Sequence, residues 1–160
     1  MTGAPRTSPA PVRKELTVEA PIERAFEVFT QGIGTWWPST HSIGSSALKT
    51  AVIEPRVGGR WYEVGEDGIE CPWGDVLAWE EPTRLVLAWR IGLDWRFEPN
   101  LLTEVEVKFT SLGSDATRVE LEHRLLENMR DQAEAARETF DSPGGWSGLL
   151  EAYSAKAKAS

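Results

Sequence analysis

Residues 35–43 read TWWPSTHSI and hold the side chains of this chain that are best suited to binding or chemistry. The His41 imidazole can accept or donate a proton, and the indoles of Trp36 and Trp37 supply flat apolar walls with one N–H donor each. General-base catalysis needs an orienting acid and a nucleophile within hydrogen-bond reach, which the sequence alone does not show. Two interpretations stay open: a ligand pocket in which His41 is a polar contact, or a hydrophobic lid on the core with His41 hydrogen-bonded to the backbone.

Tryptophan is the residue type that stands out, with copies at positions 36, 37, 61, 73, 79, 89, 95 and 146. Indoles are common in pockets that are apolar at one end and wet at the other. Several of these rings lie beside glycine, proline or a bend, where a strand opens, whereas Trp79 is expected to pack in the core. The predicted ligand-binding residues are Trp36, Trp37, His41, Trp61, Trp73, Trp89, Trp95, Phe97, His123 and Trp146.

The two adjacent indoles are expected to differ, because neighbouring side chains of a regular element point to opposite sides. We expect Trp37 to face inward and Trp36 to be more exposed. His123 shares the inward register of its strand, which indicates either the mouth of a pocket or a core histidine with satisfied hydrogen bonds.

Other reactive groups give weak signals. His41, His123 and Cys71 have none of the short ligand spacings of a zinc site, so no metal is predicted. Cys71 lies in the acidic segment IECPWGD rather than in an electropositive setting. We therefore expect its side chain to be a small buried group and not a reactive thiol. The sequence has no phosphate-binding loop, dinucleotide fingerprint, nucleophile elbow or convincing carboxylate pair. We therefore predict no catalytic residue and no cofactor, and a protein that is more a binder than an enzyme.

Length and charge narrow the class of protein. A chain of 160 residues with 41% hydrophobic and 26% charged residues is typical of one globular domain. One cysteine excludes an internal disulfide and favours a reducing compartment, so we predict a cytoplasmic protein. A net charge of −8 argues against a nucleic-acid surface, and no apolar run reaches the roughly 20 residues of a membrane span.

The elements that must position these residues follow from periodicity. Residues 1–11 are predicted to be a disordered leader and 12–158 a single domain. Alternation of apolar and polar residues predicts a strand at 12–18. Apolar residues at helical spacing predict a helix that begins near Pro21, and Gly32 and Gly34 indicate where it ends. Further strands are predicted at 50–55, 60–64, 69–80, 84–91, 101–110 and 116–123, with a bend or bulge where Trp73 projects between Pro72 and Gly74.

The last part of the chain is predicted to be helical. Residues 127–140 are charged and rich in alanine, the sequence DSPGG interrupts them, and 146–159 carry an apolar stripe. An antiparallel sheet covered on one face by a terminal helix is an α+β architecture. A gap between such a sheet and its helix is where a ligand pocket would form.

Seven segments together resemble one family: APIERAFEVFT, WWP with the following HSI, VGGRWYE, GDVLAWEEPTRLVLAW, TEVEVKFT, TRVELEHR and FDSPGGWSGLLEAY. Their order and spacing are similar to the bacterial homologues of the heat-shock protein 90 ATPase activator, within the START-like superfamily, over residues 12–156. The resemblance implies a helix-grip fold: a curved antiparallel sheet of about six to seven strands around a long C-terminal helix, with two short helices after the first strand. It also implies an apolar cavity, but no catalytic residue can be carried over.

Three hypotheses for function result. The first is a protein that binds a small hydrophobic or aromatic molecule in the cavity. The second, by resemblance to polyketide cyclases and dehydratases, is an enzyme that uses His41 or His123 as its acid–base. The third is a partner-binding domain that regulates a chaperone. A homodimer is compatible with the sequence, although no residue requires one.

Overall fold

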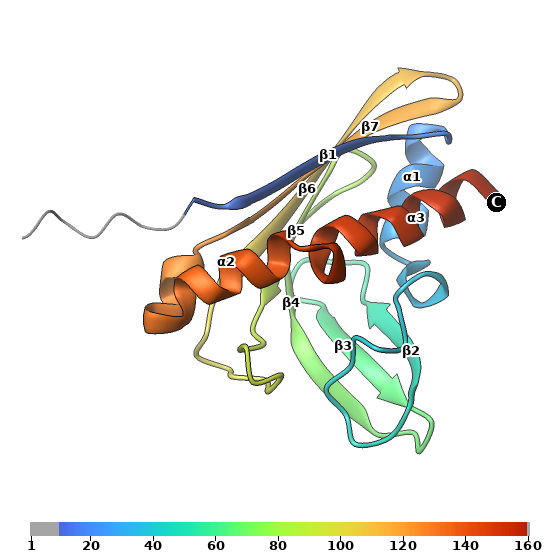
Figure 1. Ribbon diagram of the computed structural model, residues 1–160. Helices are drawn as coiled ribbons and strands as arrows, with labels where there is room; N and C mark the ends of the chain where they lie inside the picture. Colours follow the sequence, from blue (N-terminus) through green and yellow to red (C-terminus); the bar gives the residue numbers. More distant parts are fainter. Residues whose placement is uncertain (1–9, 160) are drawn as a thin grey trace, which may run out of the picture.

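A seven-stranded antiparallel sheet in the order β1-β7-β6-β5-β4-β3-β2 runs through the computed structural model, which describes residues 10–159 (Figure 1). The predicted leader, apart from residues 10 and 11, therefore lies outside the described residues. The strands are β1 Val12–Val18, β2 Leu48–Ile53, β3 Arg60–Gly65, β4 Glu70–Glu80, β5 Arg84–Trp89, β6 Thr103–Gly113 and β7 Ala116–Arg124. Each predicted strand is present, with ends shifted by a few residues.

Helical segments flank the sheet. They are α1 Ile22–Phe29, the 3₁₀ turn η1 Ile33–Thr35, the 3₁₀ segment η2 Leu126–Gln132, α2 Ala133–Asp141, the π-turn η3 Pro143–Ser147 and α3 Gly148–Ala159. Figure 1 shows α2 and α3 following one another along one face of the sheet. We call this face the inner face and the opposite one the outer face. The arrangement confirms the predicted α+β helix-grip fold with two short helices after the first strand.

The interruption between α2 and α3 has a local cause. Pro143 follows the extended Ser142, and Gly145 has non-helical dihedrals, φ −99° and ψ −135°. Proline carries no backbone N–H to continue the ladder of α2. Beyond the break, α3 buries Leu149, Leu150 and Tyr153 against the sheet and α1. The Tyr153 hydroxyl donates to the carbonyl of Ala25 at 2.7 Å, which fixes α3 to α1.

The two faces of the sheet differ as the alternation predicts. Every second residue of β7 from Thr117 to His123 is buried on the inner face. On the outer face, Arg124 pairs with Glu104, Glu106 and Glu122. Burial alone would raise the pKa of Glu106, but hydrogen bonds from Arg84 and Arg124 hold that pKa below its ordinary value. The outer face is therefore a network of ion pairs.

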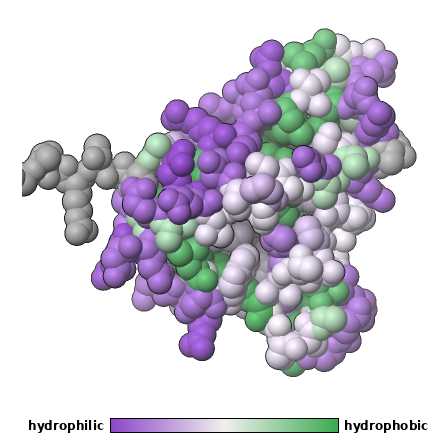
Figure 2. Space-filling view, in the orientation of Figure 1, coloured by the Kyte–Doolittle hydropathy of each residue, from purple (hydrophilic) through white to green (hydrophobic). Residues whose placement is uncertain are grey.

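The surface carries its large apolar side chains singly. Val57 and Ile69 lie between strands, Leu112 lies near the end of β6 and Trp95 lies in the loop after β5, each more than 40% exposed. Figure 2 shows the face seen in Figure 1 as hydrophilic areas with small separate apolar ones. In the described part of the chain, no helix is long and apolar enough to cross a membrane.

A bulge in β4 confirms the predicted irregularity at Pro72–Gly74. Trp61 of β3 pairs with Gly74 and Tyr62 pairs with Pro72, so Trp73 is the extra residue and its ring turns to the inner face. At Gly74 the strands approach so closely that an added Cβ would overlap the carbonyl oxygen of Ala88 on β5. Glycine at this position thus permits the bulge that places Trp73.

We expect Gly74→Ala to lower the free energy of unfolding by about 1–3 kcal/mol, since the methyl group must push β4 from β5. Gly144→Ala is the matched control, because a Cβ there meets only the Ser142 Oγ at 3.9 Å. Urea unfolding of both variants tests this expectation, and equal stability of the two would contradict it.

Candidate functional site

Eight aromatic side chains gather between the inner face and the C-terminal segment. This aromatic cluster consists of Trp36, Trp37, Trp61, Trp73, Trp89, His123, Phe140 and Trp146, and all eight are buried. Ring centroids lie 5.0 Å apart for Trp37 and Trp73 and 5.6 Å apart for Trp61 and Trp89. The His123 ring stacks on Phe140 at 4.5 Å. Such edge-to-face and tilted contacts are favoured for aromatic pairs.

Several elements contribute these rings. Trp61 comes from the inward register of β3, Trp73 from the bulge of β4, and Trp89 from the end of β5. His123 lies near the end of β7, and Trp146 is held by the π-turn η3. The sheet supplies one side of the cluster, and irregular segments together with Phe140 of α2 supply the other.

The expectation that Trp36 is more exposed than Trp37 is wrong, because both are buried, at 6% and 7% exposure. They follow η1 rather than lying on a regular element, and Trp36 has φ −127° and ψ −13°. Trp36 turns toward Phe29 and Tyr153, whereas Trp37 contacts Trp61, Trp73 and Trp146. The rule of opposite sides therefore does not apply to this pair.

Little free space remains beside the cluster. A cavity of about 30 Å³ is lined by His41, Trp89, Trp95, Thr139, Phe140, Gly144, Gly145, Trp146 and Leu149. A space of this size is of the order of one water molecule. The gap that the fold leaves between sheet and helix is thus filled by aromatic rings in this conformation.

His123 is locked by hydrogen bonds at both ring nitrogens. The Trp146 indole donates to Nδ1 at 3.1 Å, so the ring proton is on Nε2, which lies 2.8 Å from Thr103 Oγ1. The Thr103 hydroxyl in turn donates to the carbonyl of Trp89 at 2.9 Å. Burial lowers the pKa of His123 to about 3, so the imidazole is neutral. A histidine with both nitrogens engaged and no charge is a structural group, which restricts the acid–base hypothesis to His41.

His41 closes the mouth of the small cavity. Its Nε2 donates to the carbonyl of Gly144 at 2.7 Å, and its Nδ1 therefore accepts from Thr40 Oγ1 at 3.0 Å. The ring lies 6.3 Å from that of Trp95, which is 43% exposed and has a positive φ of 61°. The backbone hydrogen bond matches one of the two interpretations of residues 35–43. It joins that loop to the turn before α3.

The structure also shows a buried carboxylate that the sequence analysis did not select. Glu63 is fully buried and accepts hydrogen bonds from the backbone N–H groups of Ile43 and Gly44, at 2.7 and 3.0 Å, and from the Trp73 indole at 2.8 Å. It lies two residues after Trp61, and this spacing already places it on the inner face. Glu63 fixes the loop that carries His41 and sets the orientation of Trp73.

The selected residue Phe97 and the cysteine Cys71 lie outside the cluster. Phe97 is half-buried in the loop between β5 and β6, where it lines a separate hollow of about 520 Å³ with Pro99 and Met129 among others. Phe97 thus lies apart from the aromatic cluster, and its backbone pairs with that of Ile91. Its role as a ligand-binding residue stays a prediction. Cys71 is half-buried rather than buried, and burial together with the charges of Glu63 and Asp67 raises the pKa of its thiol. The thiol is therefore protonated at neutral pH.

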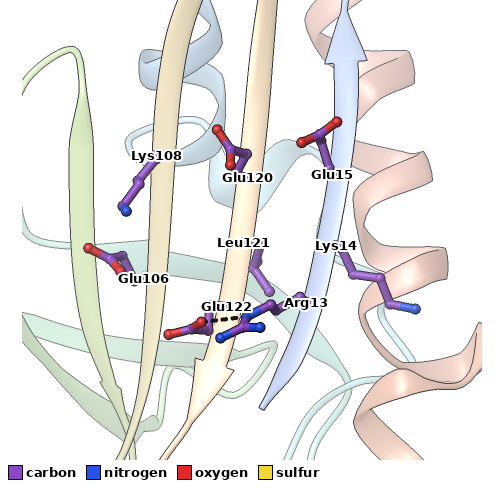
Figure 3. A pocket seen from close by; sticks show the side chains of 8 residues that line it. All are labelled: Arg13, Lys14, Glu15, Glu106, Lys108, Glu120, Leu121 and Glu122. Carbon is purple, nitrogen blue, oxygen red and sulfur yellow. Dashed lines mark hydrogen bonds and ion pairs between the residues drawn. The ribbon is translucent and has the colours of Figure 1, made fainter. Parts of the chain in front are cut away.

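A hollow on the outer face has a different character. It has a volume of about 360 Å³ and is lined by residues of β1, β6 and β7, among which only Leu121 is uncharged. Figure 3 shows these side chains and the 2.8 Å ion pair between Arg13 and Glu122. The sheet separates this hollow from the aromatic cluster. No group of three or more metal-ligating side chains forms within the described residues.

These features define an α+β helix-grip protein with an aromatic interior. The chain belongs to the family described as Activator of Hsp90 ATPase homolog 1-like protein, whose model matches residues 19–152. No match is found among the curated proteins.

Solved structures include two near full-length relatives. One is described as an anthrahydroquino-gamma-pyrone synthase, Txn09, complexed with SUM; it is 38% identical, with coverage of 92% of this chain and 97% of that chain and a TM-score of 0.65. The other is the self-sacrificing resistance protein CalC from Micromonospora echinospora, 31% identical, with coverage of 94% and 95% and a TM-score of 0.71.

A heat-shock protein 90 activator from Plasmodium falciparum is more distant. It is 22% identical, with coverage of 72% of this chain and 73% of that chain and a TM-score of 0.50, and it shows the fold alone. Contact with a chaperone, a homodimer and a cytoplasmic location stay predictions.

The buried neutral His123 predicts a dependence of stability on pH. The His123 imidazole of the unfolded chain binds a proton below about pH 6.5, whereas that of the native protein binds one only near pH 3. The free energy of unfolding should therefore fall with decreasing pH, by about 1.4 kcal/mol per unit from this group. Urea unfolding between pH 7 and 5 tests this: the stability advantage of the native chain over His123→Gln should shrink by about 2 kcal/mol. A difference that is constant with pH would contradict it.

Replacement of the buried carboxylate should also be measurable. Glu63→Gln keeps the shape but turns an amide N–H₂ toward one of three donors, and we expect a loss of about 1–3 kcal/mol. The control is Glu104→Gln, which weakens one ion pair on the outer face and should cost less than about 1 kcal/mol. Thermal unfolding compares the two, and similar losses would show that Glu63 has no special role.

Proposed function

We propose that this protein binds a flat, mainly apolar aromatic molecule between the inner face of the sheet and the segment η3–α3. The observation that carries the proposal is the aromatic cluster itself. Its rings come from both the sheet and the covering segment, and their faces would contact a flat molecule from two sides. Burial of such a ligand contributes several kcal/mol at roughly 25 cal/mol per Å² of apolar surface.

Access to the cluster is through the mouth at His41 and Trp95. The cavity there holds about 30 Å³, so a molecule of several rings must displace side chains to bind. Trp37 and Trp146 lie on irregular segments outside the sheet. The hydrogen bond from His41 to Gly144 and the contact between the two indole rings join these segments. Movement at this point leaves the strand ladder intact. Ligand binding thus requires an opened form of the loop and the turn.

The relatives support this choice of ligand class. The 38% identical protein is described as a synthase of an anthrahydroquino-gamma-pyrone and was solved as a complex, and the match spans nearly the whole of both chains. The 31% identical CalC is described as a resistance protein. A polycyclic aromatic ligand suits both the ring-rich interior of this chain and the compound class in the first description.

Titration calorimetry with 1,8-dihydroxyanthraquinone, a flavonoid and a fatty acid tests the proposal. We expect saturable binding of the polycyclic quinone and an increase in the melting temperature of the complex. Trp146→Leu, in the cluster, should weaken binding at least about tenfold, since it removes a ring wall. The control Trp79→Leu removes a ring that packs on Phe26, away from the cluster, and should bind as the native chain does. No saturable binding of any aromatic compound would contradict the proposal.

An enzymatic role is the second candidate, and the identity to a synthase favours it. Of the two histidines, only His41 lies at the mouth, and its Nε2–H is released when the bond to Gly144 opens. The imidazole would then be free to move a proton of a bound aromatic substrate. Incubation with an anthrahydroquinone that carries an unclosed ketone side chain tests this by chromatography. Ring closure, in which an aryl hydroxyl oxygen adds to the side-chain ketone carbon and the ketone oxygen leaves as water, should occur and be lost in His41→Ala, with affinity retained. No product with the native chain would exclude it.

A further inference from the structure

One buried polar group of the aromatic cluster has no partner. Trp61 is fully buried, and its indole Nε1–H is the only buried side-chain nitrogen or oxygen without a hydrogen bond among the described residues. The other cluster indoles each donate a bond: Trp36 to the Val28 carbonyl, Trp37 to the His41 carbonyl, Trp73 to Glu63, Trp89 to the Ile91 carbonyl and Trp146 to His123. The contrast is sharp because these rings share one environment.

A buried donor without an acceptor is unfavourable, and native structures seldom keep one without a reason. Trp61 lies within the cluster, with ring centroids 5.5 Å from Trp73, 5.6 Å from Trp89 and 6.3 Å from Trp37. Trp37 follows the turn η1 and lies outside the strands of the sheet. Displacement of such a ring by a ligand would bring the ligand against the Trp61 indole.

We propose that the ligand presents a neutral carbonyl oxygen to the Trp61 indole N–H. The bound class is then an aromatic ketone or quinone, rather than a pure hydrocarbon or a fatty acid. This inference rests on the proposed function and names the ligand chemistry of the same site.

The charge around Trp61 decides between a ketone and a carboxylate. The cluster contains no cation, and the buried carboxylate of Glu63 lies two residues along on the same face of β3. A second carboxylate there would be desolvated beside a like charge, which is unfavourable. A carbonyl oxygen accepts the indole hydrogen bond without that penalty.

The test compares two flat three-ring probes that differ in their oxygens, 9,10-anthraquinone and anthracene. The native chain should bind the quinone at least about tenfold more tightly, and Trp61→Phe should lose most of this preference, because phenylalanine keeps a ring but has no donor. Trp89→Phe is the matched control: it trims an equally buried ring whose N–H already bonds to the Ile91 carbonyl, and it should keep the preference.

The outcomes separate the two proposals. Failure of both probes to bind the native chain would overturn the proposed function and this inference with it. Equal affinity for the probes, or a preference that persists in Trp61→Phe, would overturn the inference alone and leave aromatic binding in place.

A measurement on the native chain avoids dependence on a variant that fails to fold. In a spectrum of ¹⁵N-labelled indoles, one N–H resonance should show the shift of a group without a hydrogen bond. Addition of anthraquinone should move it toward the hydrogen-bonded range, whereas anthracene should not. An indole spectrum in which both probes cause the same change would overturn the inference.

Discussion

The hydrogen bond from the Trp146 indole to His123 joins the C-terminal segment to the sheet, and much of the interior depends on it. It settles the proton of His123 on Nε2, which bonds with Thr103, and Thr103 in turn bonds with the carbonyl at the end of β5. Each donor in this series of three hydrogen bonds has one acceptor. His123 can therefore be fully buried and neutral. The same bond holds η3, which directly precedes α3, over the inner face.

The two faces of the sheet solve the problem of polar groups in opposite ways. On the outer face, Arg84 and Arg124 share the carboxylate of Glu106 near solvent, where screening keeps each ion pair weak. On the inner face, Glu63 has no cation and instead receives three N–H groups. These hydrogen bonds orient a loop and an indole ring, but they do not neutralise the charge of Glu63. The carboxylate of Glu63 thereby holds Trp73 and the loop that carries His41 next to each other.

The fold was predictable because alternation and turn residues are local signals. The strands, the inward register of His123 and the bulge at Trp73 all follow from spacing in the sequence. The site was predictable only in part. Trp36 was misplaced because the chain after Thr35 is not a regular element. Nothing local to Phe97 shows that its loop lies apart from the cluster. Glu63 was missed although its register placed it inward, since a carboxylate is expected to be solvated until its donors are known. Two of its three donors come from a segment about 20 residues away, and the third is the Trp73 indole on the neighbouring strand.

The filled interior limits what apolar burial can do for recognition. If an incoming ring displaces a tryptophan ring, ring contacts replace ring contacts, and only the difference contributes to affinity. Selectivity among flat molecules of similar size then depends on the polar atoms that line the site. The polar atoms of His123 and Glu63 already form hydrogen bonds within the protein, whereas the Trp61 N–H has no acceptor there. The discrimination that this interior can exert is therefore set by one donor more than by the many rings around it.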